Sequence, residues 1–532
     1  MSTAQVIDSE VPVYEMISNG YRAFLTLIVM LGAFMAILDT TVVDVVIPKM
    51  MGPLSTDLYG VQWVITAYMI AAAVGLLLTH SLVKVVGLKN VFLTGLVFFT
   101  SASVLCGSAS SLPQMIGSRV MQGMGEAFIM ASAQTILFSL YPPEKHGLAM
   151  GIYAMGVSFA PSLGPTVGGW ITEHLAWRWV FYINLPTGIM NLVAAIFFLP
   201  VIVRHREKLH FNFISYFFIA TFTISLLILL SKGQQLGWGQ SNLIVILGSV
   251  AFIALILYVL SEMFCIHPLI DMNIFKIREY TLSMGFYFLV MGLSIYQIFY
   301  LLPLYYENLK HLGTFATGIH MLTFAIFIAI LSPGAGILSD RFGPTSVLVV
   351  STVIYLVTSF YLIPSLNYYT PSVRAAIITI PLGISLGSFF APVSAQALGK
   401  LGPYTSQGVS IMHYLRFLGG SLGTAMATNT LEMRHAVHYE GISALQNNGY
   451  VQGFITSTAN HMSGFMPVDL AVARAHGLLV RVQSVKALSL SFQDTFRHTS
   501  FFGTFGSVFL ILMLIDGRRT KKMMLMKRKR KL

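Results

Sequence analysis

Two acidic residues lie inside one long apolar stretch of this chain, at the depth where a helix would cross a bilayer. The stretch covers residues 25–48 and contains Asp39 and Asp44. An acidic side chain at the centre of a bilayer costs about 2.5–3.5 kcal/mol on insertion scales, so such residues generally face water or a partner and carry function. The alternative is a silent carboxylate held by hydrogen bonds or by a cation. We interpret Asp39 as functional, and both interpretations stay open for Asp44.

A second apolar stretch, residues 112–138, contains Arg119 and Glu126. These two residues are seven positions apart, too far for an i,i+4 pair, so Arg119 is expected to meet Asp39 or Asp44 from another helix. Arginine stays charged at any relevant pH and favours an ionised partner, whereas burial favours a neutral one. This competition suits proton coupling, because protonation of the carboxylate would release the arginine. A static ion pair that fixes the helix register is the alternative.

Small residues recur on one face of a third stretch, residues 146–172. They are Gly156, Ala160, Gly164, Gly168 and Gly169, with Pro161 and Pro165 in step with them. Faces made of small residues let membrane helices approach closely, and each proline removes a backbone hydrogen bond. The pattern predicts a closely packed helix that can bend, as a moving part requires.

The composition places these stretches in a membrane. Hydrophobic residues make up 55% of the 532 residues and charged residues 10%, with a mean hydropathy of +0.75, whereas a soluble domain has about 25% charged residues. Backbone groups in lipid must pair within their own segment, so the apolar stretches should be helices. We therefore predict an all-α integral membrane protein of fourteen helices, near residues 22–48, 61–80, 90–108, 112–138, 146–172, 178–201, 211–231, 242–266, 281–306, 313–339, 345–364, 372–398, 408–431 and 499–516.

The charge pattern predicts the orientation. The net charge is +12, but much of it lies in residues 517–532, directly after the last apolar stretch, which indicates an anchor on anionic lipid and not a nucleic-acid site. Lysine and arginine are also more frequent in alternate short loops, which predicts that both termini are cytoplasmic. Five histidines in residues 432–498 lack metal-ligand spacing, and no Gly-x4-Gly-Lys-Ser/Thr loop occurs, so we expect no metal site and no ATP-hydrolysing enzyme.

A weak internal repeat predicts the domain organisation. Lys84 and Gly87 end the second stretch as Gly336, Asp340, Arg341 and Gly343 end the tenth, and duplicated halves place a transporter's substrate site at their interface. The predicted divisions are a cytoplasmic segment 1–21, a six-helix bundle 22–201, an inserted helix pair 202–280, a second bundle 281–516 and a basic tail 517–532. The second bundle includes a long outer loop, 432–498, in which residues 468–492 read as an amphipathic helix lying on the membrane or on a partner.

Several of these motifs resemble the major facilitator superfamily, and within it the fourteen-helix drug:proton antiporters of the EmrB/QacA type. The resemblance spans almost the whole chain. It is carried by Leu38-Asp39-Thr40-Thr41, by Arg119 with Gln122-Gly123, by the small-residue strip, and by the run from Trp177 to Pro186. It implies two six-helix bundles plus an inserted pair, a bacterial inner-membrane location and export driven by the proton gradient without a cofactor. The EmrB side of that group also works with a periplasmic adaptor and an outer-membrane channel.

The chain departs from the family pattern at two positions. Lys84 stands where the loop after the second helix normally has an aspartate that locks the inner gate, so that lock is either weakened or reversed in polarity. Glu126 stands where the family usually has a small residue. It is a candidate second protonation site or a substrate-facing charge.

Candidates for a substrate pocket are less distinctive, because aromatic and methionine side chains also serve ordinary helix packing. Arg416 is a further buried cation whose counter-charge the sequence does not show. The other candidates are Phe34, Met35, Gln122, Gln134, Tyr296, Gln297 and Tyr300.

The prediction that follows is a proton-coupled antiporter that exports hydrophobic or amphipathic small molecules by alternating access. Proton-coupled uptake on the same fold, or transport of a metabolite, siderophore or fatty acid, is one alternative. A membrane scaffold or sensor that transports nothing is another.

Overall fold

The computed structural model describes residues 6–7, 12–202, 211–265, 268–444 and 448–529. Parts of the predicted segments 1–21, 202–280 and 517–532 therefore lie outside the described residues. The described chain is almost entirely helical. Its strands are the two-residue β1 (Val6–Ile7) and β2 (Val201–Ile202), which pair in parallel.

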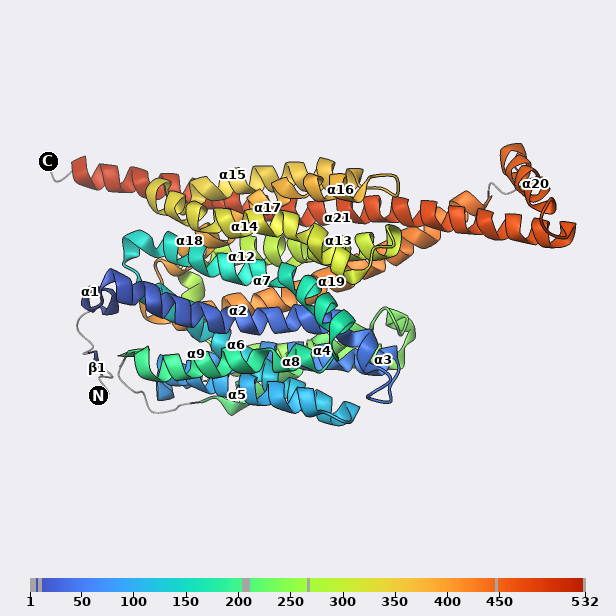
Figure 1. Cartoon of the computed structure of the whole chain (residues 1–532). Coiled ribbons are helices and arrows are strands. Elements are labelled where there is room, and N and C mark those ends of the chain that lie inside the picture. The colour runs from blue at the N-terminus through green and yellow to red at the C-terminus, as the bar shows by residue number, and fades with distance from the viewer. Residues whose placement is uncertain (1–5, 8–11, 203–210, 266–267, 445–447, 530–532) are drawn as a thin grey trace.

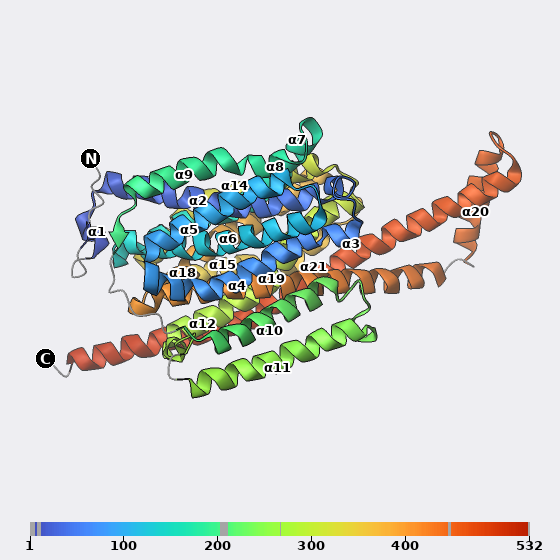
Figure 2. The same cartoon turned by 90° about the horizontal axis from the view of Figure 1, so that it is seen from below.

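The first half of the chain forms one group of long helices. Short helices α1 (Val13–Met16), α3 (Leu58–Val61) and α8 (Trp179–Tyr182) lie between them. The long helices are α2 (Asn19–Met50), α4 (Trp63–Val86), α5 (Leu88–Ser108), α6 (Leu112–Leu140), α7 (His146–His174) and α9 (Asn184–Phe198). Helices α10 (Phe213–Lys232) and α11 (Asn242–Phe264) follow and pack against each other along one edge of the bundle (Figure 2).

The second half forms a similar group with more irregular helices. Helix α12 (Arg278–Tyr287) continues through a π-helical segment, Phe288–Ile295, into α13 (Tyr296–Leu304). The remaining helices are α14 (Thr314–Phe342), α15 (Pro344–Val357), α16 (Ser372–Ile378), α17 (Ile380–Gly387), α18 (Phe390–Leu398), α19 (Thr405–Ser443), α20 (Gly449–Ser463) and α21 (Val468–Lys529).

The all-helical membrane class is confirmed. Among the described residues, twelve helical segments are long and apolar enough to cross a membrane. Two of the fourteen predicted spans, 112–138 and 408–431, correspond to α6 and α19, which lie in the bundle but are not among these twelve. Both helices carry buried charged and amide side chains, and these polar residues lower their apolar character. The count of fourteen spans stays a prediction.

The region predicted as an outer loop, 432–498, is instead largely helical. Helices α19 and α21 run out of the bundle together and project far beyond it, with α20 at the tip (Figures 1 and 2). Helix α20 packs on α21 through a small cluster of Ile455, Ala459, Ala475 and Leu479. We call the part of α19 beyond residue 432, α20 and the part of α21 before residue 498 the helical hairpin.

Residues 468–492, predicted as an amphipathic helix lying on the membrane or on a partner, are helical, but the helix does not end at residue 492. Helix α21 is continuous from Val468 to Lys529, so it includes that segment, the predicted last span and part of the predicted tail. Polar residues near Asp494 interrupt the apolar pattern without ending the helix. Asp494 Oδ2 accepts hydrogen bonds from the Arg434 side chain, with Arg434 Nε at 2.7 Å, and lies 2.8 Å from His438 Nε2, so these residues join α19 to α21.

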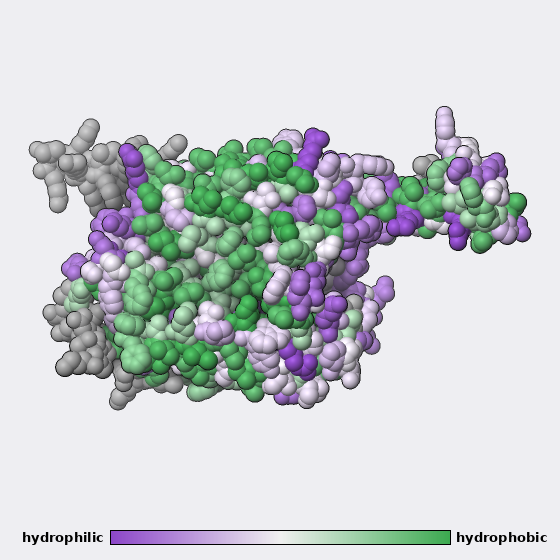
Figure 3. All heavy atoms as spheres, in the orientation of Figure 1, coloured by the Kyte–Doolittle hydropathy of each residue, from purple (hydrophilic) through white to green (hydrophobic). Residues whose placement is uncertain are grey.

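The two ends of the bundle differ. The start of α2 and the end of α21 lie at one end, and the helical hairpin projects from the other (Figure 1). Apolar side chains dominate the middle of the visible face, and polar residues gather toward the end that carries the hairpin (Figure 3). The described parts of both terminal segments thus lie at the same end of the bundle, and that this end faces the cytoplasm stays a prediction.

Candidate functional site

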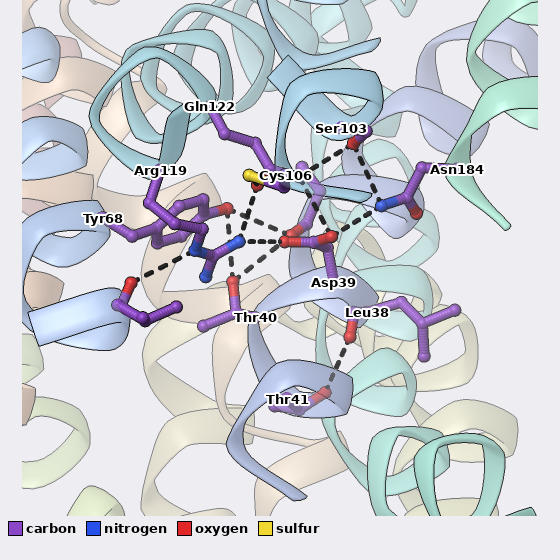
Figure 4. Close-up of polar contacts among 12 residues, drawn as sticks. Leu38, Asp39, Thr40, Thr41, Tyr68, Ser103, Cys106, Arg119, Gln122 and Asn184 are labelled. Carbon is purple, nitrogen blue, oxygen red and sulfur yellow. Dashed lines mark hydrogen bonds and ion pairs between the residues drawn. The ribbon is translucent and has the colours of Figure 1, made fainter. Parts of the chain in front are cut away.

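A buried ion pair between α2 and α6 forms the centre of the candidate site. Arg119 Nη1 lies 2.7 Å from Asp39 Oδ2 (Figure 4), and side-chain exposure is 1% for Arg119 and 0% for Asp39. Of the two carboxylates that the sequence offered as partners of Arg119, the structure thus selects Asp39. Further polar contacts hold this pair in place, and several of them come from other helices.

The Asp39 carboxylate accepts hydrogen bonds at both oxygens. Oδ1 accepts from Gln122 Nε2 at 3.0 Å and from Asn184 Nδ2 at 2.6 Å, while Oδ2 accepts from Arg119. An ionised carboxylate only accepts hydrogen bonds, and charge-assisted hydrogen bonds are the strongest kind. In this conformation the network therefore fits a charged Asp39.

The Arg119 guanidinium is also well satisfied. Nε donates to the Val64 carbonyl at 3.2 Å and Nη1 donates to Gln122 Oε1 at 2.7 Å, while Cζ lies 3.9 Å from the centroid of the Tyr68 ring. A cation over an aromatic face is stabilised further when water is excluded. Arg119 and Gln122 are three residues apart and so lie on one face of α6.

Glycines bring the helices of this network close together. A Cβ on Gly123 would lie 2.3 Å from the Tyr68 carbonyl oxygen of α4, and one on Gly125 would lie 2.6 Å from the Phe99 backbone nitrogen of α5. A Cβ on Gly188, one turn after Asn184, would lie 2.3 Å from Thr100 Oγ1. These contacts explain how short side chains from separate helices reach one carboxylate.

Sequence reasoning missed the outer part of the network. Ser103 Oγ accepts from Gln122 Nε2 at 2.9 Å and from Asn184 Nδ2 at 3.3 Å, and Cys106 Sγ lies 3.6 Å from Gln122 Oε1. Asn184 is one of two amides, with Asn191, in a mostly apolar run and was a recognisable signal. Ser103 and Cys106 were not, because such residues are common in membrane helices.

Asp44 stands apart from the network. Its residue is exposed, and it makes no hydrogen bond with the described residues. It still lies within electrostatic range of Arg119 and Asp39. The structure therefore leaves Asp44 outside the hydrogen-bonded network and makes Asp39 the partner of Arg119.

Glu126 lies deeper in the protein, on the same helix as Arg119. It is 2% exposed, its Oε2 has no hydrogen-bond partner among the described residues, and it lies close to the Tyr68 side chain. Arg416 of α19 is the strongest charged neighbour of Glu126. Glu126 thus lies within electrostatic range of both the Asp39 network and a polar group around Arg416.

That polar group surrounds Arg416. The side chains in electrostatic contact with Arg416 are Tyr296, Tyr287, Tyr153 and Glu126. His413, one turn earlier on α19, is fully buried, and its Nε2 lies 3.3 Å from the Tyr153 hydroxyl. Residues of α6, α7, α12, α13 and α19 therefore meet here, between the two halves of the bundle.

The other pocket candidates have mixed surroundings. Gln134 is buried, with Nε2 3.5 Å from Met150 Sδ and with Oε1 lacking a partner among the described residues. Gln297 Nε2 donates within its own helix to Leu293 at 2.7 Å, and Tyr300 pairs with Thr428 at 3.0 Å. Met35 is buried in the apolar core and Phe34 packs against it.

The small-residue strip of α7 packs closely, as predicted. A Cβ on Gly164 would lie 2.5 Å from Thr41 Cβ and 2.9 Å from the Thr41 carbonyl carbon of α2, whereas one on Gly156 would meet the flexible end of Met30. A Cβ on Gly169 would lie 3.1 Å from the Phe315 backbone nitrogen of α14. Gly168 is buried, and Pro161 and Pro165 lie inside a helix that continues through them. Helix α7 therefore touches α2 and α14, which belong to different halves.

The two repeat loops have the same backbone geometry. Gly87 ends α4 with φ +85° and Gly343 ends α14 with φ +88°, a region that favours glycine. In the second loop Asp340 accepts hydrogen bonds from the backbone N–H groups of Gly147 at 2.6 Å and Leu148 at 2.9 Å. These groups start α7, so Asp340 caps a helix of the other half.

The remaining residues of the two loops lie differently. A Cβ on Gly336 would lie 2.2 Å from the Gly147 carbonyl oxygen, so α14 and α7 are in close contact above the cap. Arg341 and Lys84 are exposed. Lys84 acts electrostatically on His80, as Asp271 also does. The cap that joins the halves at this end is thus provided by Asp340.

Among the described residues, no group of three or more His, Cys, Asp or Glu side chains is placed to hold a metal ion.

Comparison with known proteins identifies the class that this fold and site define. Residues 29–424 match the Major Facilitator Superfamily, and the chain belongs to that superfamily of transporters. It is 30% identical to the multidrug export protein EmrB of Haemophilus influenzae over 80% of this chain and 83% of that protein. It is also 30% identical to the fatty acid resistance protein FarB of Neisseria gonorrhoeae, over 80% and 84%. The chain is thus an EmrB-like member of the superfamily.

Solved structures agree on the fold. A crystal structure of a double tryptophan mutant of XylE aligns with a TM-score of 0.57 and 12% identity, over 92% of this chain and 95% of that chain. At this identity the similarity concerns the fold alone. The superfamily match and the apolar helices together make the protein a multi-pass membrane transporter.

Proposed function

We propose that this transporter is a proton-coupled antiporter that exports hydrophobic or amphipathic small molecules by alternating access. The buried Asp39–Arg119 pair is the observation that carries the proposal. Removing one partner of a buried pair costs about 3–5 kcal/mol, so loss of the Asp39 charge is a large perturbation of the helices around it. Similarity to EmrB and FarB supports export of drug-like or fatty-acid-like compounds.

The network suggests an order of events. In the described conformation Asp39 is charged and holds Arg119, Gln122 and Asn184. When a proton arrives at Asp39, the neutral acid no longer holds the guanidinium, and α2 and α6 can separate. The exposed Asp44, within electrostatic range of both members of the pair, is the proposed entry point for that proton. Glu126 is a second proposed protonation site, because its unpartnered Oε2 is costly for a buried carboxylate.

Helix α7 provides a mechanical link between this switch and the rest of the transporter. Thr41 lies two residues from Asp39 and packs directly against Gly164. The same helix contacts α14 at both of its ends, through Gly147 and Gly169. A shift of α2 on protonation would therefore move a helix that both halves share.

The test is proton movement driven by substrate in reconstituted vesicles. Asp39→Asn should abolish pH-driven counter-flow of an exported compound while the protein inserts and binds that compound normally. The matched control is Asp469→Asn, which removes an exposed carboxylate from the helical hairpin and should leave counter-flow unchanged. Wild-type counter-flow in the Asp39→Asn vesicles would contradict the proposal and move the coupling role to Asp44 or Glu126.

The same vesicles decide the direction of transport and so test the uptake alternative. Export predicts that an acidic outside drives loss of compound, whereas uptake predicts accumulation under the same gradient. Absence of any proton movement linked to substrate would instead favour the scaffold or sensor alternative.

We further propose a bacterial inner-membrane location with both termini in the cytoplasm. That orientation puts the helical hairpin on the outer side, where a periplasmic adaptor, and through it an outer-membrane channel, would bind. Site-directed labelling of a cysteine at Tyr450, at the hairpin tip, in intact cells tests this orientation, and labelling only after the membrane is broken would contradict it.

A further inference from the structure

Two arginines are buried in the described membrane part of this protein, and they are satisfied very differently. Arg119 forms an ion pair with Asp39 and two further hydrogen bonds. Arg416 is 6% exposed, yet in the part of the chain that the structure describes its guanidinium forms no hydrogen bond and no ion pair, only a ring contact with Phe417 at 5.3 Å. A buried charge is normally paired and hydrogen-bonded, so Arg416 calls for an anion.

The acidic side chain nearest to Arg416 does not fill that role. Glu126 is the acidic group among its four electrostatic neighbours, the others being tyrosines. The two residues form no ion pair among the described contacts, and Glu126 Oε2 is itself without a partner. A gap therefore separates a fixed positive charge from its nearest negative one.

Other buried polar atoms around this gap also lack partners among the described residues. They include the Tyr287 hydroxyl and His413 Nδ1, both of which lie within electrostatic range of Arg416. Tyr287 and His413 are both 0% exposed. They come from α12 and α19 of the second half, and each normally forms a hydrogen bond when buried. Several unsatisfied groups converging on one region indicate a site that a ligand completes.

Aromatic rings adjoin the same region. Phe390 stacks on Tyr153 with ring centroids 5.9 Å apart, and it contacts the edge of Tyr287 at 6.1 Å. Such rings provide apolar surface for a hydrocarbon or aromatic group next to the charge. A strong cation with apolar walls matches a ligand that has one anionic end and one apolar end.

We propose that Arg416 binds the anionic head group of the substrate, and that the exported compounds are therefore amphipathic acids. The planar guanidinium matches an oxyanion such as a carboxylate or sulfonate through two parallel hydrogen bonds, and the Tyr287 hydroxyl donates a third. This inference rests on the proposed function, in that the ligand is taken to be the transported compound. Glu126 and the anionic substrate are both attracted to Arg416. They therefore compete for its positive charge.

The experiment measures equilibrium binding to the full chain in lipid nanodiscs, with empty nanodiscs subtracted. The probes are radiolabelled octanesulfonate, octanol and octyltrimethylammonium, which share one tail and differ in charge. Wild-type protein should prefer the sulfonate. Arg416→Gln should weaken sulfonate binding about tenfold or more, as expected for a lost charge-assisted contact, with octanol binding unchanged. Glu126→Gln should strengthen sulfonate binding, because the competing negative charge is removed.

Two variants keep this test interpretable. Lys89→Gln also removes one buried positive charge, but Lys89 Nζ binds the carbonyls of Ile196 at 2.8 Å and Leu199 at 2.6 Å, outside the site, and should not change the preference. Arg416→Lys should retain part of the preference, since the charge remains. Thermal stability of Arg416→Gln should equal that of the wild type, and octanesulfonate should raise the melting temperature of the wild type alone.

Equal sulfonate binding by wild type and Arg416→Gln would overturn the proposal, as would a wild-type preference for the cation. The measurement uses no gradient, so it is separate from the Asp39→Asn test. If counter-flow is not coupled to protons but the sulfonate preference follows Arg416, the coupling proposal fails and this one stands. If counter-flow is coupled to protons but the sulfonate preference does not depend on Arg416, only the proposal that Arg416 binds an anionic substrate fails.

Discussion

At the scale of single residues, this transporter contains carboxylates in three different environments within one region. Asp39 is buried with three hydrogen-bond donors, Glu126 is buried with one oxygen unpartnered, and Asp44 is exposed. Environment decides which ionisation state a carboxylate prefers. In the proposed mechanism the three groups have different tasks: Asp39 holds the network, Glu126 binds a proton inside it, and Asp44 admits protons to it.

One prediction at this scale concerns Asn184, which sequence reasoning overlooked. Asn184→Ala removes the shortest hydrogen bond to Asp39 Oδ1, at 2.6 Å. A buried acceptor that loses a donor costs about 1–3 kcal/mol, so the melting temperature of the purified protein should fall. Asn90→Ala, at an exposed position on α5 where Nδ2 donates to the carbonyl of Val86 at the end of α4, is the control and should change little. Equal melting temperatures for the two variants would show that Asn184 does not support the pair.

At the scale of helices, close packing concentrates where α7 meets its neighbours. Gly164 approaches the backbone of α2 near Thr41, and Gly147 and Gly151 approach the backbone of α14. Without side chains at these positions the helices make extensive van der Waals contact, the main source of association between helices in lipid. In the proposed mechanism a helix held on two sides in this way transmits movement from one half to the other.

Two substitutions on α7 test this arrangement because they are chemically identical. Gly→Ala inside a helix normally stabilises it by about 1 kcal/mol. Gly164→Ala should nevertheless slow transport, since its Cβ would lie 2.5 Å from Thr41 Cβ and 2.9 Å from the Thr41 carbonyl carbon. Gly156→Ala should transport normally, because its Cβ meets only the movable end of Met30.

Initial rates of counter-flow at equal membrane levels are the measurement for this pair. If both variants transport at the wild-type rate, the Gly164 contact is not part of the moving machinery. If both are equally impaired, the effect belongs to the glycine content of α7 as a whole and not to its contact with Thr41.

At the scale of the whole molecule, one acidic residue joins the two halves at the end that carries the chain termini. Asp340 of α14 caps the first backbone N–H groups of α7, at Gly147 and Leu148. A carboxylate at a helix N-terminus is stabilised by the partial positive charge there. The first-half loop has Lys84 in the matching position, so the two repeat loops differ in charge at this point.

The prediction at this scale is that Asp340→Asn opens the inner end. Loss of a charged cap weakens closure by about 0.5–2 kcal/mol, which corresponds to roughly a twofold to thirtyfold change in the open population. The measurement is the labelling rate of single cysteines introduced on either side of the central region. The rate should rise for cysteines on the inner side and fall for those on the outer side. The control is Asp271→Asn, which removes an acid from the segment between α11 and α12, where Asp271 Oδ1 accepts from the nearby Asn273 backbone at 2.9 Å. Unchanged labelling in Asp340→Asn would show that the cap does not control closure.

The sequence alone was sufficient for the class of this protein and for the centre of its site. Hydropathy is local, so apolar stretches predict membrane helices without knowledge of their neighbours. A charge in such a stretch is costly wherever the helix packs, which is why Asp39 and Arg119 were recognisable and their pairing could be predicted. The glycines that end the repeat helices, Gly87 and Gly343, could also be recognised in the sequence, because a positive φ favours glycine.

The tertiary structure decided what depends on distances between helices. It selected Asp39 over Asp44 as the partner of Arg119, and it brought Asn184 and Ser103 to the same network. It also joined residues 468–492 to the last span in one helix. Polar residues interrupt the apolar pattern there, but the helix continues because Asp494 pairs with α19. Hydrogen bonds and ion pairs act over a few ångströms between residues far apart in the chain, and no local pattern of residue types contains that information.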